Sequence, residues 1–87
     1  MPAIAHLGDE LDHGGSIASA SPNVYADGKP VARVGDRAFC AQHGIVTIDS
    51  GAATVLINGQ PAAYDGSQCS CGAVVISTGG TVFVPGG

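Results

Sequence analysis

Short apolar runs separated by glycine-containing turns recur along the chain. Val24–Pro30 and Val55–Pro61 follow one pattern, 31 residues apart: an apolar run, then Asp-Gly or Asn-Gly, then a second run that begins with Pro. Asp-Gly and Asn-Gly tolerate the positive φ angles at the centre of a type I′ turn, which is the strongest short-range signal for a hairpin. Apolar residues nowhere recur at the i, i+3, i+4, i+7 spacing of an amphipathic helix. The sequence therefore predicts two β-hairpins in an all-β chain with almost no helix.

A third copy of the pattern is divided between the two ends of the chain. Thr81–Val84 is an apolar run without a return strand, and Ala3–Leu7 resembles a return strand without an outgoing one. Gly8-Asp9 follows this N-terminal run as Gly35-Asp36 follows the corresponding run of the next unit. We expect the two ends to pair as strands, so that three units close into a pseudo-threefold array without free sheet edges.

The composition indicates a small domain that needs support beyond its hydrophobic core. The chain has 87 residues, of which 14 are Gly, two are Phe, two are Tyr and none is Trp. A core with so few large side chains gives thin stability, and domains only slightly smaller commonly add a metal or disulfides. We expect a single domain over residues 1–87, without an N- or C-terminal extension that carries a further domain.

The charge pattern argues against nucleic acid as a partner. The net charge is −4, and the only Lys or Arg residues are Lys29, Arg33 and Arg37, whereas phosphate binding needs clustered basic side chains. The N-terminal segment lacks the basic and apolar regions of a secretory signal peptide, and no apolar run is long enough to span a bilayer. We therefore expect synthesis in a reducing cytoplasm. There, three cysteines, an odd number, favour metal binding or free thiols over a disulfide framework.

Histidine and cysteine residues recur at one place in each unit. His13, His43 and Cys71 each precede a Gly and lie 11, 12 and 11 residues before the next apolar run. Cys40 supplies a fourth ligand, because Cys40 and His43 form a Cys-x-x-His pair on one loop. A mixed set of four Cys and His ligands suits tetrahedral Zn²⁺ rather than the oxygen-seeking Ca²⁺ or Mg²⁺. The sequence predicts one structural zinc ion held by these four side chains.

Cys69 is the alternative to Cys71 as the last ligand. Counting four residues on from an aspartate in each unit gives a different set, namely His13, Cys40 and Cys69, counted from Asp9, Asp36 and Asp65. The Cys-Gly context and the distance to the next strand both favour Cys71. A cysteine without a metal in an apolar protein is usually a small buried hydrophobe, and that is the role we expect for Cys69.

The remaining polar residues predict no catalytic site. We expect His6 to be a hydrogen-bonded bystander in a strand and Arg33 and Asp36 to form a strand-end ion pair of small worth. We expect Asp9, Glu10 and Asp12 to lie in a solvated loop. A catalytic zinc keeps one position open for water, whereas four protein ligands leave none. The sequence therefore indicates a protein that is not an enzyme.

Several of these segments resemble one known family. Pro30-Val31-Ala32-Arg33 and Pro61-Ala62-Ala63-Tyr64 are similar to the Pro-Ala-Ala-Arg signature of PAAR-repeat proteins. The resemblance extends over essentially the whole chain through further matching segments: Asp12–Gly15, Cys40–Gly44, Thr54–Gly59 and Cys71-Gly72. The chain departs from the signature at single positions, and its N-terminal unit carries His6 where the next unit has Arg33.

The resemblance implies a cone-shaped tip protein with a metal near its apex. Proteins of this family sit on the blunt end of the trimeric VgrG spike of the type VI secretion system and sharpen it for membrane puncture. The expected partners are therefore one VgrG-type trimer per tip and effector proteins, with membrane contact only through mechanical penetration. Export from the bacterial cytoplasm would then use the secretion machine and no signal peptide. The alternative function is a metal-dependent structural adaptor on another oligomeric, phage-like spike or platform.

Overall fold

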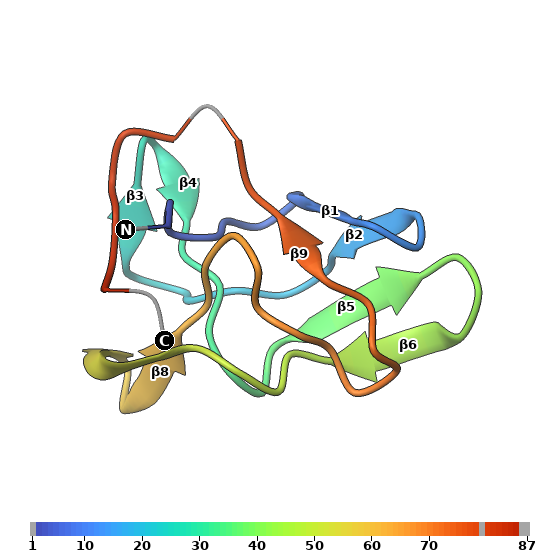
Figure 1. Cartoon of the computed structure of the whole chain (residues 1–87). Coiled ribbons are helices and arrows are strands. Elements are labelled where there is room, and N and C mark those ends of the chain that lie inside the picture. The colour runs from blue at the N-terminus through green and yellow to red at the C-terminus, as the bar shows by residue number, and fades with distance from the viewer. Residues whose placement is uncertain (1, 79, 86–87) are drawn as a thin grey trace.

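Figure 1 presents the computed structural model of the chain, in which residues 2–78 and 80–85 are described. These residues contain nine short strands and no helix: β1 Glu10–Leu11, β2 Gly15–Ile17, β3 Tyr25–Ala26, β4 Lys29–Pro30, β5 Arg37–Cys40, β6 Gly44–Thr47, β7 Ala52–Ile57, β8 Gln60–Ala62 and β9 Val75–Ile76. The prediction of an all-β chain is confirmed.

Both predicted hairpins form, at one end of the molecule. β3 pairs with β4 and β7 pairs with β8, both antiparallel. Asp27 and Asn58 have φ angles of 53° and 54°, and the glycine after each is also in the positive-φ region, as a type I′ turn requires. The remaining strands form one sheet in the order β6-β5-β2-β1-β9, which lies at the other end in Figure 1.

A ring of backbone hydrogen bonds relates the three units at their centre. Ala5 donates to Ala63, Ala63 donates to Ala32, and Ala32 donates back to Ala5, with N···O distances of 2.9, 3.0 and 2.9 Å. All three alanines are fully buried. A larger side chain here would have to displace close-packed neighbours. The ring makes residues 5, 32 and 63 equivalent and so defines the pseudo-threefold relation between the units.

The two ends of the chain complete the third unit, as the sequence predicts. Ala3 and Phe83 form an antiparallel bridge. Around it, Ile4 donates to the carbonyl of Val82 and Val84 donates to that of Pro2, both at 2.9 Å. The pairing matches the other two hairpins in register, since Tyr25 faces Pro30 and Leu56 faces Pro61. The predicted closure is confirmed.

The hydrophobic core consists of small aliphatic side chains in two clusters. One cluster lies under the five-stranded sheet and includes Leu11, Ile17, Ile48 and Val75. The other lies among the hairpins and includes Ile4 and Val31. The molecule measures only 29 × 23 × 21 Å along its principal axes. Neither cluster contains a buried Phe or Trp, so hydrophobic burial leaves the fold in need of other support.

Candidate metal centre

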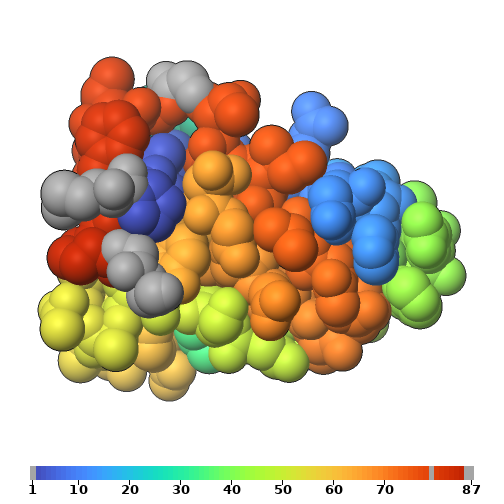
Figure 2. Space-filling view, viewed as in Figure 1, coloured from blue at the N-terminus to red at the C-terminus, as the bar shows by residue number. Residues whose placement is uncertain are grey.

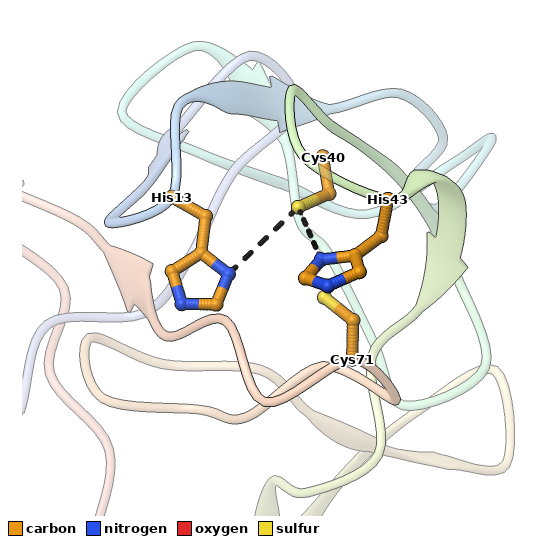
Figure 3. Close-up of side chains that lie close together, drawn as sticks. All are labelled: His13, Cys40, His43 and Cys71. Carbon is orange, nitrogen blue, oxygen red and sulfur yellow. Dashed lines mark hydrogen bonds between the residues drawn. The ribbon is translucent and has the colours of Figure 1, made fainter.

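Three loops, one from each unit, bring four metal-ligating side chains together at the end away from the hairpins. His13 lies in the β1–β2 turn, Cys40 and His43 flank the β5–β6 turn, and Cys71 precedes β9 (Figure 3). The potential ligand atoms of these four residues all lie within 4.8 Å of one another. Cys40 Sγ is 3.4 Å from His43 Nδ1 and 3.9 Å from His13 Nδ1. The four side chains are positioned to hold a metal ion.

Glycine makes the turn at each of these loops possible. Gly14, Gly44 and Gly72 directly follow His13, His43 and Cys71, and their φ angles are 84°, 79° and 90°. A residue with a Cβ rarely adopts such angles. The ligand-Gly pairs that recur in the sequence are therefore a backbone requirement, because the glycine turns the chain so that the preceding side chain faces the shared site.

The spacing of the donor atoms fits a tetrahedral zinc ion. Zn–S and Zn–N bonds of about 2.3 and 2.0–2.1 Å place tetrahedral donors about 3.3–3.8 Å apart. The two measured S···N distances, 3.4 and 3.9 Å, lie at or close to that range. Asp12 Oδ1 lies on the outer side of the His13 ring, 3.9 Å from Nε2, where carboxylates commonly orient metal-binding histidines. Small movements of the four side chains would complete the site.

The protonation of the two buried cysteines separates Cys40 from Cys69. Burial would raise the pKa of the Cys40 thiol, but hydrogen bonds with His43, the backbone of Gln42 and His13 outweigh it and lower the pKa to about 6. Burial, followed by the charge of Cys71, raises the pKa of Cys69 to about 11. The thiolate is the form that binds metal, so Cys40 is prepared for a metal and Cys69 is not.

The structure brings Cys71 to the group and leaves Cys69 in the core. Cys69 is 3% exposed and packs in the cluster beneath the sheet. The count that favoured Cys69 began from Asp65, and that starting point is wrong. Asp9, Asp36 and Ser67 make the same turn hydrogen bond to the residue three before them, which makes Ser67 the equivalent residue. Four residues on from Ser67 is Cys71, so both ways of counting now agree.

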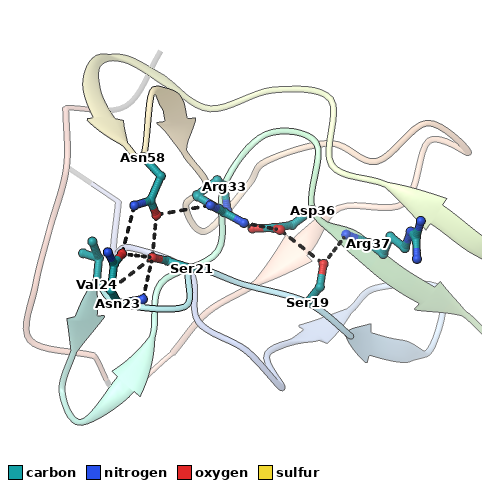
Figure 4. A network of polar contacts seen from close by, with 8 residues as sticks. All are labelled: Ser19, Ser21, Asn23, Val24, Arg33, Asp36, Arg37 and Asn58. Atoms are coloured by element: carbon teal, nitrogen blue, oxygen red, sulfur yellow. Dashed lines mark hydrogen bonds and ion pairs between the residues drawn. The ribbon is translucent and has the colours of Figure 1, made fainter.

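The other polar residues singled out in the sequence lie outside this group. The predicted ion pair is confirmed, since Arg33 Nη2 lies 2.9 Å from Asp36 Oδ1. It is more buried than a strand-end surface pair, because the Asp36 side chain is only 6% exposed. Sequence reasoning missed the extension of this pair to Asn58 and Ser21, which Figure 4 shows. His6 is buried beside Asp9, with Nδ1 3.2 Å from its carboxylate.

The metal centre gives a direct test of the Cys71 assignment. Replacing Cys71 with Ser should lower the metal content from about one ion per chain, because a hydroxyl is a poor substitute for a thiolate ligand. Replacing Cys69 with Ser should leave the metal content unchanged, although it places a hydroxyl in the core. Metal analysis of the two purified variants checks this, and metal loss only in Cys69→Ser would reverse the assignment.

Comparison with known proteins adds one match. The family model described as PAAR motif matches residues 7–77 of the chain, which includes all four side chains of the metal centre. No curated protein matches the sequence. Among the described residues, no helix has the length and apolar character needed to cross a membrane.

Proposed function

Because the chain belongs to the PAAR-motif family of spike-tip proteins linked to type VI secretion, we propose that it is a zinc-stabilised tip that caps a VgrG-type trimer and sharpens it for membrane puncture. The end of the molecule with the three hairpins is the docking base, and the end with the metal centre is the apex. The chain is made in the bacterial cytoplasm, leaves through the secretion machine and carries effector proteins as further partners.

One observation carries the proposal, a set of three exposed apolar side chains at equivalent positions. Tyr25, Leu56 and Phe83 are 60%, 60% and 54% exposed. They occupy the same register position in the three hairpins, opposite Pro30, Pro61 and Ala3 respectively. We call these three side chains the base triad. In Figure 2, β7 in yellow and the C-terminal segment in red both lie at the hairpin end of the molecule.

The base triad fits a partner with threefold symmetry. A trimer of identical subunits offers the same surface three times around its axis, and a single chain can match all three only if it repeats its own contact residues. Exposed aromatic and large aliphatic side chains are typical anchors of protein interfaces. The pseudo-threefold base therefore supports a stoichiometry of one tip per trimer.

Zinc in this proposal has a structural role. Four protein ligands fill a tetrahedral coordination shell, so no position remains for a substrate or a reactive water. The ion adds a cross-link between three loops that backbone hydrogen bonds already join, such as those from Ala41 to Gly14 and from Asp12 to Val74. We therefore propose that the protein is not an enzyme.

A charge placed on the base triad should abolish docking. Tyr25→Asp, Leu56→Asp and Phe83→Asp should each weaken binding to the purified VgrG-type trimer of the same bacterium at least tenfold. Burying one such side chain at an interface is worth about 1.5–3 kcal/mol, and a factor of ten corresponds to about 1.4 kcal/mol. Biolayer interferometry with immobilised trimer measures the affinity.

Phe39→Asp and Ile45→Asp are the matched controls, because these residues are 49% and 65% exposed but lie on the five-stranded sheet. They should bind the trimer like wild type. Wild-type affinity in all three triad variants, with loss of binding in the two controls, would place the docking surface on the sheet and contradict the proposed base. Binding only to a different spike-like platform would favour an adaptor role.

A further inference from the structure

The position that directly follows the ring alanine is occupied by His6, Arg33 and Tyr64 in the three units. In two of the units, those of His6 and Arg33, this side chain reaches towards the turn of a neighbouring hairpin. Arg33 binds the Asp36 carboxylate through Nε and Nη2, both at 2.9 Å, and its Nη1 lies 3.2 Å from Asn58 Oδ1 in the β7–β8 turn (Figure 4). In this unit a permanent cation links the strand after the ring to the next hairpin.

His6 occupies the same position and faces the corresponding two residues. Its Nδ1 lies 3.2 Å from Asp9 Oδ2, and its Nε2 lies 3.6 Å from Asp27 Oδ2 in the β3–β4 turn. Asp9 is the equivalent of Asp36, and Asp27 occupies the turn position of Asn58. The His6 side chain is 5% exposed, and Nε2 is buried without a hydrogen-bond partner among the described residues. Among the described residues, Asp9 and Asp27 are the charged groups that lie within ion-pair distance of the His6 imidazole.

The chemistry of this arrangement favours a charged imidazole. A neutral histidine has one N–H and one lone pair, whereas ionised carboxylates only accept hydrogen bonds. A neutral ring between Asp9 and Asp27 would therefore point a lone pair at one of them. An imidazolium donates from both nitrogens and gives each carboxylate a partner, as the Arg33 guanidinium does for its own two. A buried carboxylate that faces a lone pair, with no hydrogen-bond donor, lowers the stability of the folded state.

Asp27 extends the contact to the C-terminal segment. Both carboxylate oxygens of Asp27 accept hydrogen bonds from Thr81, one from the backbone N–H at 2.9 Å and one from the hydroxyl. These bonds lower the pKa of Asp27, so this carboxylate stays ionised at neutral pH. Gly80 packs against the imidazole, because a Cβ added there would lie 3.2 Å from His6 Cε1. The cluster of His6, Asp27 and Thr81 therefore joins the N-terminal strand, the β3–β4 turn and the C-terminal segment.

We infer that protonated His6 holds the two ends of the chain together by bridging Asp9 and Asp27, as Arg33 bridges Asp36 and Asn58. We call the pairing of the two chain ends the seam, and His6 its cationic clamp. Arg33 keeps its charge at every physiological pH, whereas histidine changes its charge between about pH 5 and 8. The closure of the third unit therefore strengthens with the charged ring and weakens as pH rises and the ring loses its second proton. Phe83 of the base triad lies in the C-terminal segment that this closure holds in place. The clamp therefore also stabilises the docking base, and this last step rests on the function proposed above.

The charge on His6 can be observed directly in the zinc-loaded protein. Histidine ¹⁵N chemical shifts distinguish imidazolium from neutral imidazole, and the zinc-bound rings of His13 and His43 give separate signals. We expect wild-type His6 to carry protons on both ring nitrogens at pH 6. In Asp27→Asn, a smaller fraction of His6 should carry both ring protons at the same pH, because an opposite charge at this distance favours the charged form. A neutral His6 ring at pH 6, or an equal imidazolium fraction in wild type and Asp27→Asn, would overturn the inference.

Thermal unfolding gives a second readout that does not depend on the partner. The melting temperature of wild type should fall between pH 6 and pH 8.5 relative to that of Asp27→Asn, because only wild type loses a bridged cation over this range. His6→Arg should restore a melting temperature that changes little over the same range, and His6→Gln should melt below wild type at pH 6. Parallel pH profiles for wild type, His6→Arg and Asp27→Asn would contradict the clamp, whereas failure to bind a trimer would bear only on the proposed function.

Discussion

The variant His43→Ala is expected to lose its cooperative unfolding transition or to melt at least about 20 °C below wild type. In a domain of this size, a loss of about 1 kcal/mol in unfolding free energy lowers the melting temperature by about 4–8 °C. His43 is exposed, so its truncation removes little packing and chiefly removes a ligand. Structural zinc contributes on the order of 10 kcal/mol of apparent free energy in small domains, which is comparable to the total stability of a typical domain. The small aliphatic core cannot replace that contribution.

Stripping the metal from wild type with a chelator should reproduce the effect, and restoring zinc should reverse it. Gln42→Ala is the matched control, because Gln42 lies on the same turn and is exposed but has no place in the metal group. Circular dichroism during heating, with and without chelator, gives the comparison. If His43→Ala and the stripped protein both melt within a few degrees of wild type, the metal is not what stabilises this fold.

Deletion of residues 1–7 is expected to prevent folding even with zinc present. The deletion removes Ala5 from the central ring, and with it the donor to Ala63 and the acceptor for Ala32. It also removes the partners of Val82 and Val84 in the C-terminal segment. Each buried backbone group left without a partner costs about 1–3 kcal/mol, and several such losses together are comparable to the stability of an ordinary small domain.

A synthetic peptide of residues 1–9 supplies the control for this deletion. Added in excess to the truncated chain with zinc, the peptide should restore the native circular dichroism spectrum, because it returns the missing strand as a separate molecule. The metal ligands are intact throughout, so zinc binding alone cannot account for a rescue. A truncated chain that melts like wild type without the peptide would mean that the ring and the seam contribute little.

The features that sequence could predict are those with a local signal. Asp27 and Asn58 identify their hairpins because few residues other than glycine accept their φ angles. The divided third unit could be predicted because the C-terminal run lacks a return strand and the N-terminal run lacks an outgoing strand. The ligand loops were visible through the ligand-Gly pairs, which a turn with positive φ requires.

The features that sequence did not predict depend on contacts between distant segments. Strands of two to four residues, such as β1, β2 and β9, are too short for alternation to reveal them, so the five-stranded sheet was not predicted. The recurrence of Ala5, Ala32 and Ala63 at one position of each unit is visible in the sequence. The ring of hydrogen bonds between them was not predicted, because it joins segments that are far apart in the chain. Asp65 misled the count of ligands because an aspartate next to Gly66 resembles the Gly-Asp pairs, whereas the hydrogen bonds assign that place to Ser67.

His6 marks the boundary between these two groups. A histidine hydrogen-bonded within its own strand could be expected from sequence, and the contact with Asp9 fits that expectation. The second carboxylate comes from the turn of another hairpin, and Thr81 joins it from the far end of the chain. A local reading cannot bring three such segments together, so the role of His6 follows only from the closed structure.

Native mass spectrometry of the tip mixed with its VgrG-type trimer tests the central claim most directly, because one spectrum reports both the metal and the partner. The account predicts one complex, in which a single chain carrying a single zinc ion is bound to three spike subunits. A trimer-bound species should disappear when the base triad carries aspartates, while the free chain keeps its zinc. A complex with three tip chains per trimer, or a bound chain without metal, would contradict the account of a zinc-held, pseudo-threefold tip.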